Sequence, residues 1–262
     1  MKKYLYVFKS SFIESFTYIP AILFKFFGFF ITMFIMFSLW RYVYTDKSQI
    51  INNFTLTQMM WYLLISEIFT YGHGPIANTE ATKNIQDGNI AYTINKPYNY
   101  VLYILTRHLA DGVIRIFMFT MICIFIGMLF VGPIPNFNPS YIPLMALSCL
   151  FGYVINALIR IGISMLAFWT EDSTPFMWIY NKLLLIFGVF FPIDMFPKWL
   201  QPILKYTPVY TVLYGPVILV LKFSYALFLK IIFAQLIYFI VVVLIITILY
   251  KRGAKKLNVN GG

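Results

Sequence analysis

The sequence predicts an all-α membrane protein with six transmembrane helices. Of its 262 residues, 61% are hydrophobic and only 11% are charged, and its mean hydropathy is +0.79. Soluble domains carry far more charge, whereas this composition is typical of proteins whose solvent is lipid. Apolar runs near 20 residues, the length that crosses about 30 Å of hydrocarbon, recur along the chain. We therefore expect a single transmembrane domain over residues 1–262.

The apolar runs give the predicted spans in order. They cover residues 20–42, 54–72, 108–131, 142–169, 177–193 and 227–250. Lys and Arg gather on cytoplasmic segments of membrane proteins, and here they are more frequent on the inner segments if the N-terminus is inside. This bias predicts a multi-pass protein of the cell membrane with cytoplasmic N- and C-termini, the latter as a tail over 251–262. The net charge of +11 then reflects topology and contact with anionic membrane lipids, and no nucleic-acid surface is expected.

Residues 1–19 precede the first span and predict a helix lying in the inner interface of the membrane. Large apolar side chains recur there at helical spacing, at Leu5, Phe8, Phe12, Phe16 and Ile19. Polar residues stand between them, at Lys2, Lys9, Ser10 and Glu14. An amphipathic helix of this kind lies flat on the membrane. The alternative is a first span that begins early, which three lysines and a glutamate would resist.

The polar stretch between the second and third spans, residues 73–100, is predicted to be cytoplasmic. Asn78 or Thr79 can cap a short helix, and Glu80 favours its positive first turn. Gly88 after Asp87 supplies a residue suited to positive φ, which ends the helix. About two helical turns result. Such a loop is either a docking surface or a solvated connection between spans.

Residues 188–216 are apolar enough to enter the membrane but cannot form one continuous helix. Five prolines interrupt them, at Pro192, Pro197, Pro202, Pro208 and Pro216. Non-helical backbone at membrane depth is tolerated only where protein or water covers it. We expect two short helices that re-enter the outer leaflet as an outer lid, with Asp194 and Lys198 paired at i, i+4 and Trp199 at the interface. The residues assigned to this lid are Pro192, Asp194, Pro197, Lys198 and Trp199.

Charged residues within the spans predict either an inner gate or structural ion pairs. Lys25, Glu67 and Arg160 all fall in the cytoplasmic half of their spans. A charge at that depth costs several kcal/mol unless it is paired or hydrated. Glu67 is the natural counter-ion of Arg160 or Lys25. On the third span, Arg107, Asp111 and Arg115 repeat at i, i+4 and permit a ladder of charges on one helix face.

The residues offer little that indicates enzyme chemistry or a metal site. The two histidines, His73 and His108, stand without an HExxH, GxSxG or carboxylate cluster. The two cysteines, Cys123 and Cys149, lie in apolar runs, where a thiol packs as a small hydrophobe. We therefore expect no metal and no catalytic residue on this chain.

The order of these features resembles the permease subunit of type-2 ATP-binding-cassette (ABC) exporters. Such permeases have an interfacial elbow helix, six spans, a coupling helix between spans two and three, and re-entrant helices before span six. The matching stretches are "IQDGNIAYTINKP", "GVFFPIDMFPKWLQPILKYTPVY" and the tail "YKRGAKKLNVNGG", at residues 85–97, 188–210 and 250–262. The glycine loop followed by Lys-Pro, and the terminal Gly-Gly, resemble the branch of small permeases grouped with viologen exporters.

This resemblance implies a partner and a mode of action. A cytoplasmic ABC ATPase dimer would bind ATP and Mg and receive the coupling helix in a surface groove. The implied contact residues are Glu80, Lys83, Asn84, Gln86, Asp87 and Gly88. The chain has no GxxxxGK[ST] phosphate loop, so it is not expected to hydrolyse ATP itself. A second permease chain, identical or related, would complete the pathway for a hydrophobic or amphipathic cargo such as a drug, lipid or peptide; the viologen-type resemblance favours a heteromeric pair.

Two rival functions remain open from the sequence. A secondary transporter or channel that works without ATP would show inverted repeats with broken helices in both halves, whereas only the second half has a proline-broken segment. A membrane enzyme acting on lipids would show converging acids, bases or metal ligands, and none is evident. An ATPase reading frame beside the gene would favour the exporter.

Overall fold

The computed structural model describes residues 2–46, 49–90 and 98–260, the last four of these by their backbone alone. The Lys-Pro turn at 96–97 and the terminal Gly-Gly at 261–262, both used in the resemblance above, lie outside the described residues. The described residues are almost entirely helical, as predicted, with one antiparallel pair of short strands in which Ile50 pairs with Thr55.

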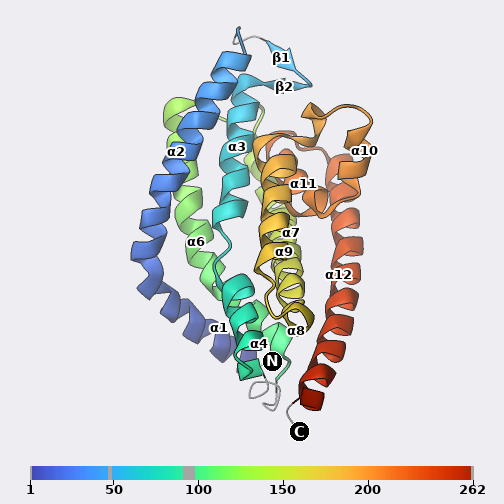
Figure 1. The fold of residues 1–262 in the computed structure, drawn as a ribbon. Coiled ribbons are helices and arrows are strands. Elements are labelled where there is room, and N and C mark those ends of the chain that lie inside the picture. Colours follow the sequence, from blue (N-terminus) through green and yellow to red (C-terminus); the bar gives the residue numbers. More distant parts are fainter. Residues whose placement is uncertain (1, 47–48, 91–97, 261–262) are drawn as a thin grey trace.

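The helices run mostly along one direction (Figure 1). The longer ones are α1 (Lys2–Ser15), α2 (Ile19–Val43), α3 (Leu56–Tyr71), α6 (Tyr100–Phe130), α7 (Ile142–Ser164), α9 (Thr174–Leu184) and α12 (Tyr225–Asn260). The shorter ones are α4 (Ala81–Gln86), α8 (Ala167–Thr170), α10 (Leu200–Lys205) and α11 (Gly215–Leu221). Single turns of 3-10 or π helix are η1 (Phe16–Tyr18), η2 (Ile76–Glu80), η3 (Pro139–Tyr141), η4 (Leu185–Phe190), η5 (Ile193–Met195) and η6 (Tyr210–Tyr214). The strands are β1 (Ile50–Ile51) and β2 (Phe54–Thr55).

Four helical stretches in the described chain are long and apolar enough to cross a membrane. They are Lys2–Val43, Tyr100–Phe130, Pro139–Thr170 and Tyr225–Lys256. The other two predicted spans correspond to shorter elements. Helix α3 has 16 residues, or roughly 24 Å at 1.5 Å per residue, and α9 continues through η4 as the apolar stretch Thr174–Phe190. By length and composition, the helices therefore support a multi-pass membrane protein.

Two predicted boundaries differ from the structure. The third span was expected to begin at residue 108, but α6 begins at Tyr100 because the Asn99 side chain caps it, accepting a hydrogen bond from the backbone N–H of Leu102 at 3.2 Å. The eight residues before the predicted start, 100–107, are thus helical. At the other end of the chain, the segment set apart as a tail at residue 251 continues α12 through Asn260.

Helix α1 lies against the lower end of α6, and the chain turns at η1 into α2 (Figure 1). Pro20 stands in the first turn of α2, where its missing N–H leaves no bond unmade. The hydroxyl of Tyr4 accepts a hydrogen bond from the backbone N–H of Asn99 at 3.0 Å, fixing α1 to the start of α6. Leu5 and Ile13 of α1 stay exposed, so the helix presents an apolar surface away from the bundle.

Buried apolar residues form two clusters along the bundle. The larger joins α2, α3, α6, η6 and α11 in the upper part, and the smaller joins η2, α4, α8 and the lower parts of α6, α7 and α12. Large apolar side chains also remain exposed on the outer faces of α2 and α12, among them Phe24, Phe34, Leu229 and Phe233. Lipid would cover such side chains, whereas in water a surface this apolar would aggregate.

The proline-rich segment 188–216 forms short helical pieces joined by turns. Helix α10 lies at the upper end, and η6 with α11 packs among α3, α7 and α12 (Figure 1). Trp199 is exposed, as an interfacial residue would be. The expected pair between Asp194 and Lys198 is wrong. Asp194 instead accepts a hydrogen bond from the Tyr214 hydroxyl at 2.5 Å, because the chain turns back on itself between Asp194 and Tyr214. This bond ties the turn at η5 to η6.

Candidate functional site

The first candidate site is the surface around α4, at the end of the bundle where both ends of the chain lie (Figure 1). Lys83, Gln86, Asp87 and Gly88 are all exposed there, and Gly88 has φ of +70°, so it ends the helix as predicted. The predicted start is wrong. The helical turns begin at Ile76 after Pro75, and no side chain caps them, so neither Asn78 nor Thr79 has that role.

Glu80 and Asn84, also predicted to face a partner, are only half exposed. The Glu80 carboxylate accepts a hydrogen bond from Arg107 of α6, and Arg107 also forms an ion pair with Glu14 of α1 at 3.3 Å. Arg107 therefore links α1, η2 and α6 and departs from the ladder expected on α6. The Asp111–Arg115 step of that ladder does form, since Arg115 pairs with Asp111 at 2.7 Å and both are buried.

The inner face of α4 is fixed to the turn between α8 and α9. The hydroxyls of Thr82 and Ser173 are hydrogen-bonded at 2.6 Å, and both residues are buried. Ile85 of α4 lines a groove of about 570 Å³, together with Phe168 and the exposed acids Glu171 and Asp172. Hydrogen bonds from Thr174 lower the pKa of Asp172, so this rim of the groove stays negatively charged at neutral pH.

The second candidate site is a buried polar cluster between α3, α6, α7 and α9. The rings of His73 and His108 stack, and their Nδ1 and Nε2 atoms lie 2.9 Å apart. Nε2 of His73 lies 2.8 Å from Nδ2 of Asn156, and the Tyr153 ring stacks on His73 with a centroid distance of 4.3 Å. The meeting of the two histidines was not predicted from the sequence.

Asn156 also organises the other side of the cluster. Its Oδ1 accepts hydrogen bonds from Nε of Arg160 at 3.2 Å and from the Tyr180 hydroxyl at 2.9 Å. The Arg160 guanidinium lies over the Tyr180 ring at 5.6 Å. Asn156 and Arg160 share one face of α7 at i, i+4, which is the signal that could have found this part of the cluster.

Glycines allow the backbone to approach the cluster closely. A Cβ on Gly74 would lie 1.7 Å from Oδ2 of Asp111, and one on Gly112 would lie 2.0 Å from the Tyr153 hydroxyl. Neither position accepts a side chain without displacing a buried polar group. These two residues therefore let the chain after α3 cross between α6 and α7.

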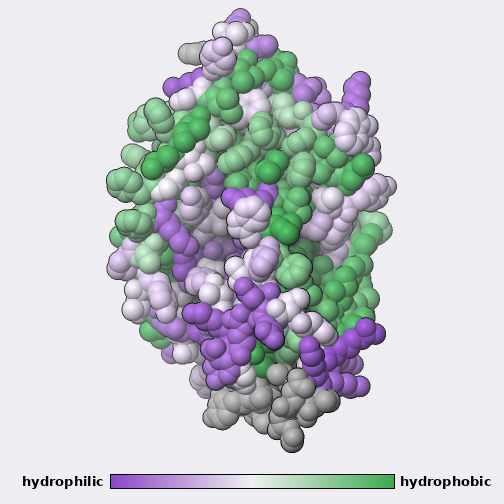
Figure 2. All heavy atoms as spheres, viewed as in Figure 1, coloured by the Kyte–Doolittle hydropathy of each residue, from purple (hydrophilic) through white to green (hydrophobic). Residues whose placement is uncertain are grey.

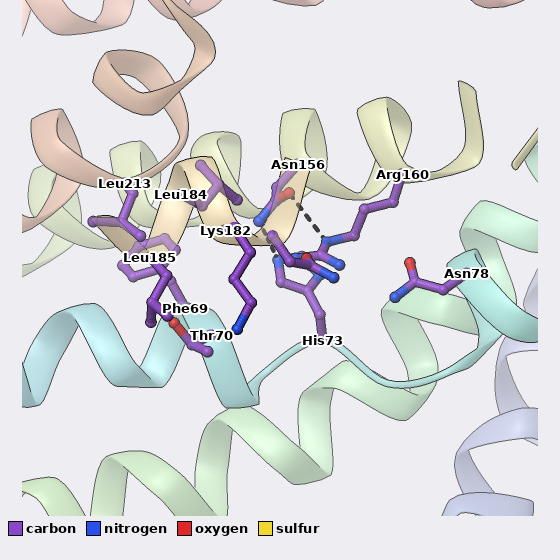
Figure 3. Close-up of a pocket in the computed structure, with 11 residues that line it drawn as sticks. Phe69, Thr70, His73, Asn78, Asn156, Arg160, Lys182, Leu184, Leu185 and Leu213 are labelled. Carbon is purple, nitrogen blue, oxygen red and sulfur yellow. Dashed lines mark hydrogen bonds between the residues drawn. The ribbon is translucent and has the colours of Figure 1, made fainter. Parts of the chain in front are cut away.

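Beside the cluster lies a pocket of about 280 Å³ (Figure 3). Its residues are Phe69, Thr70, His73, Asn78, Asn156, Arg160, Asn181, Lys182, Leu184, Leu185 and Leu213. Asn156 and Asn78 lie on the side of Arg160 and His73, whereas the leucines, Phe69 and Thr70 lie at the other end. Lys182 of α9 extends between the two groups (Figure 3). The pocket is thus polar and basic at one end and apolar at the other.

The predicted pairing of the charges within spans is wrong. Among the described residues, no ion pair within 4.0 Å joins Glu67 to Lys25 or Arg160. Lys25 is exposed on α2, Glu67 is buried on α3, and Arg160 takes Asn156 and the Tyr180 ring as its partners. Charge sign and depth suggested a pair, but the direction in which each helix face points decides which groups meet.

Comparison with known proteins decides the family. A family model described as ABC-2 family transporter protein matches residues 29–261, which is most of the chain. The chain belongs to the ABC-2 transporter family. This membership supports the expectation of an ABC permease component that works with an ATPase component, while the viologen-exporter branch is not distinguished by it. A search of curated proteins found no match.

Permeases of the ABC-2 family generally work with an ATPase component. The exposed residues of α4 lie on the end of the bundle that carries the termini. The polar cluster and its pocket lie inside the bundle. On the face that Figure 2 shows, hydrophilic residues gather at the lower end and extend upward between hydrophobic flanks.

Proposed function

We propose that the chain is the membrane-spanning permease subunit of an ATP-driven exporter that moves a hydrophobic or amphipathic cargo, such as a drug, lipid or peptide, out of the cell. Two permease chains, identical or related, would form the pathway, and a separate cytoplasmic ATPase dimer would bind and hydrolyse ATP with Mg. The observation that carries this proposal is the exposed helix α4, between α3 and α6, in a member of the ABC-2 family.

In this proposal α1 is the elbow helix, α4 is the coupling helix, and both termini are cytoplasmic. Six crossings follow if α3 and the stretch α9–η4 are counted with the four longer apolar stretches. Segment 188–216 then lies at the outer side as a lid of re-entrant helices. The exposed Trp199 suits the outer interface, and the basic residues of α1 and of the last turns of α12 suit the inner one.

ATP-driven movement would enter through the exposed residues of α4, which are Lys83, Gln86, Asp87 and Gly88. The hydrogen bond between Thr82 and Ser173 would pass this movement to the turn before α9. Helix α9 carries Lys182 into the pocket and Tyr180 onto Arg160, so a shift of α9 changes the pocket directly. Glu80 would hold α4 to Arg107 from the inside and would not contact the ATPase.

Two cysteine variants test the proposal. Gln86 is exposed on α4 and Trp199 is exposed before α10, so neither substitution disturbs the core. In Gln86→Cys, a thiol cross-linker should join the chain to the ATPase encoded nearest to it, and in Trp199→Cys it should not. An impermeant thiol reagent applied to intact cells should label Trp199→Cys and should label Gln86→Cys only after lysis.

The native chain is the control for both measurements, because Cys123 is buried and Cys149 is half-buried. Labelling of Gln86→Cys from outside would overturn the orientation. Cross-linking of the ATPase to Trp199→Cys rather than Gln86→Cys would overturn the assignment of α4.

A further inference from the structure

The pocket beside the polar cluster contains a buried cation that lacks an anionic partner. Arg160 is only 6% exposed. In the described chain its guanidinium has one hydrogen bond to an amide oxygen, a contact from Nη1 to the Met177 sulfur at 3.9 Å, and the face of Tyr180. No carboxylate lies within 4.0 Å of it among the residues described. An unpaired charge inside a membrane bundle costs several kcal/mol, so Arg160 would gain from a bound anion.

The rest of the polar end strengthens this preference. Lys182 also lines the pocket. The other polar side chains of the pocket, including Asn181 and Asn78, are neutral donors and acceptors. Oδ1 of Asn78 is buried without a hydrogen-bond partner in the described structure, and because it is an acceptor it does not itself hold an anion. Among the residues that the structure describes, no Asp or Glu lines the pocket. The pocket therefore offers two positive charges and amide groups, which suit a phosphate or carboxylate and repel a cation.

The opposite end of the same pocket is apolar. Phe69, Leu184, Leu185 and Leu213 line it, from α3, α9, η4 and η6 (Figure 3). A small inorganic anion would leave these side chains without a partner. A molecule with an acidic headgroup and a hydrocarbon tail would fill both ends at once, with the headgroup at Arg160 and the tail toward Leu213.

We infer that this pocket binds an anionic amphiphile, through a phosphate or carboxylate headgroup held by Arg160 and Lys182. The inference rests on the proposed transport function only in so far as the bound amphiphile is taken to be a cargo or a membrane lipid. Binding itself requires no ATPase. It also separates this chain from exporters of cations, because a dicationic viologen placed beside Arg160 and Lys182 would be repelled.

Equilibrium binding to the full chain tests the inference. The probe is dodecyl phosphate, titrated calorimetrically into the purified chain in an uncharged detergent. Arg160→Gln should weaken the binding of dodecyl phosphate roughly thirty-fold, because the headgroup loses its buried positive partner. Lys182→Gln, at an exposed residue, should weaken it only about two- to five-fold. Lys230→Gln is the matched control, because Lys230 is exposed on α12 and lines none of the pocket.

Further probes separate the possible sources of the anion. Inorganic phosphate should bind far more weakly than dodecyl phosphate, and neither dodecyltrimethylammonium nor methyl viologen should displace the probe. Equal binding of inorganic phosphate would overturn the amphiphile, and displacement by the cations would overturn the charge preference. Unchanged affinity in Arg160→Gln would overturn the site.

Folding of the variants does not decide the result. Arg160→Lys keeps the charge and should retain most of the affinity, so it distinguishes loss of charge from loss of structure. If Arg160→Gln fails to fold, the contrast between Lys182→Gln and Lys230→Gln still tests the site. Equal affinities in those two variants would contradict it. A positive binding result with no ATP-driven transport would retain this site and reject the proposed exporter.

Discussion

The hydroxyls of Thr82 and Ser173 meet at 2.6 Å in a buried contact between α4 and the turn that precedes α9. They are 91 residues apart in sequence, and the hydrogen bond joins the surface proposed to meet the ATPase to the helix that carries Lys182. Because both hydroxyls are buried, the removal of one leaves the other without a partner. A substitution at one of the two residues should therefore destabilise the protein, and a second substitution at the other should recover part of the loss.

Thr82→Val should lower the free energy of unfolding by about 1–3 kcal/mol, since the Ser173 hydroxyl loses its partner while the volume is kept. Adding Ser173→Ala should cost less than the sum of the two single changes, because no buried hydroxyl is then left unpaired. Thermal or denaturant unfolding of the three variants gives the coupling energy. Strictly additive losses would mean that the contact does not stabilise the protein.

Gly74→Ala should destabilise the chain strongly, because the added Cβ would lie 1.7 Å from Asp111 beside the buried Asp111–Arg115 pair. Breaking such a pair costs about 3–5 kcal/mol. Gly28→Ala is the matched control. Its Cβ would meet only the Tyr71 hydroxyl at 3.6 Å, and alanine favours a helix interior by about 0.5–1 kcal/mol. Unfolding temperatures should fall for the first variant and hold or rise for the second; equal values would contradict the close approach at Gly74.

Glu67→Gln should leave the unfolding temperature unchanged or raise it, because Glu67 is buried without an ion pair among the described residues and gains little from its charge. Asp111→Asn is the contrasting variant, since Asp111 does hold a buried partner, and we expect a loss of about 3–5 kcal/mol there. A comparable loss in Glu67→Gln would show that Glu67 has a basic partner after all.

Arg107→Gln should loosen α1 from the bundle, because Arg107 bonds to Glu14 of α1 as well as to Glu80. Hydrogen exchange of the backbone amides over Lys2–Ser15 measures this directly, and we expect faster exchange there with little change in α12. Arg41→Gln, at the exposed far end of α2, serves as the control. Unaltered protection of α1 would assign its docking to apolar contacts and the Tyr4–Asn99 bond alone.

Local chemistry made part of this fold predictable. The apolar runs located the helices, Gly88 marked the end of α4, and the prolines of 188–216 predicted short pieces in place of one span. Boundaries were less certain, because Asn99 had an unrecognised capping role that starts α6 eight residues early. Each of these features depends on a few neighbouring residues, so the sequence displays them.

The buried polar cluster was harder to predict, because its residues come from four segments far apart in the chain. Nothing local to His73 or His108 indicates that their rings stack. Glu67 and Arg160 have suitable signs and depths but sit on helix faces that do not bring them within 4.0 Å of each other. Asn156 and Arg160 are the exception, because their i, i+4 spacing on α7 marks a polar helix face in the sequence itself.

Two glycines provide a matched pair of variants. They test the proposal that α4 couples ATP hydrolysis to transport. Gly88 follows α4, with φ of +70°, and Gly132 follows α6 at the opposite end of the bundle, with φ of +93°. Beyond the chain neighbours, neither has any atom within 4 Å of an added Cβ, so a valine at either position mainly adds backbone strain of about 1–3 kcal/mol. The two variants thus differ mainly in where the strain falls.

The most direct test is ATPase stimulation and cargo transport, measured in vesicles that contain the chain, its ATPase and any second permease, for Gly88→Val and Gly132→Val side by side. If α4 is the coupling helix, Gly88→Val should lose most of both activities while the chain stays folded, and Gly132→Val should keep them. Equal activity in the two variants would contradict the role of α4.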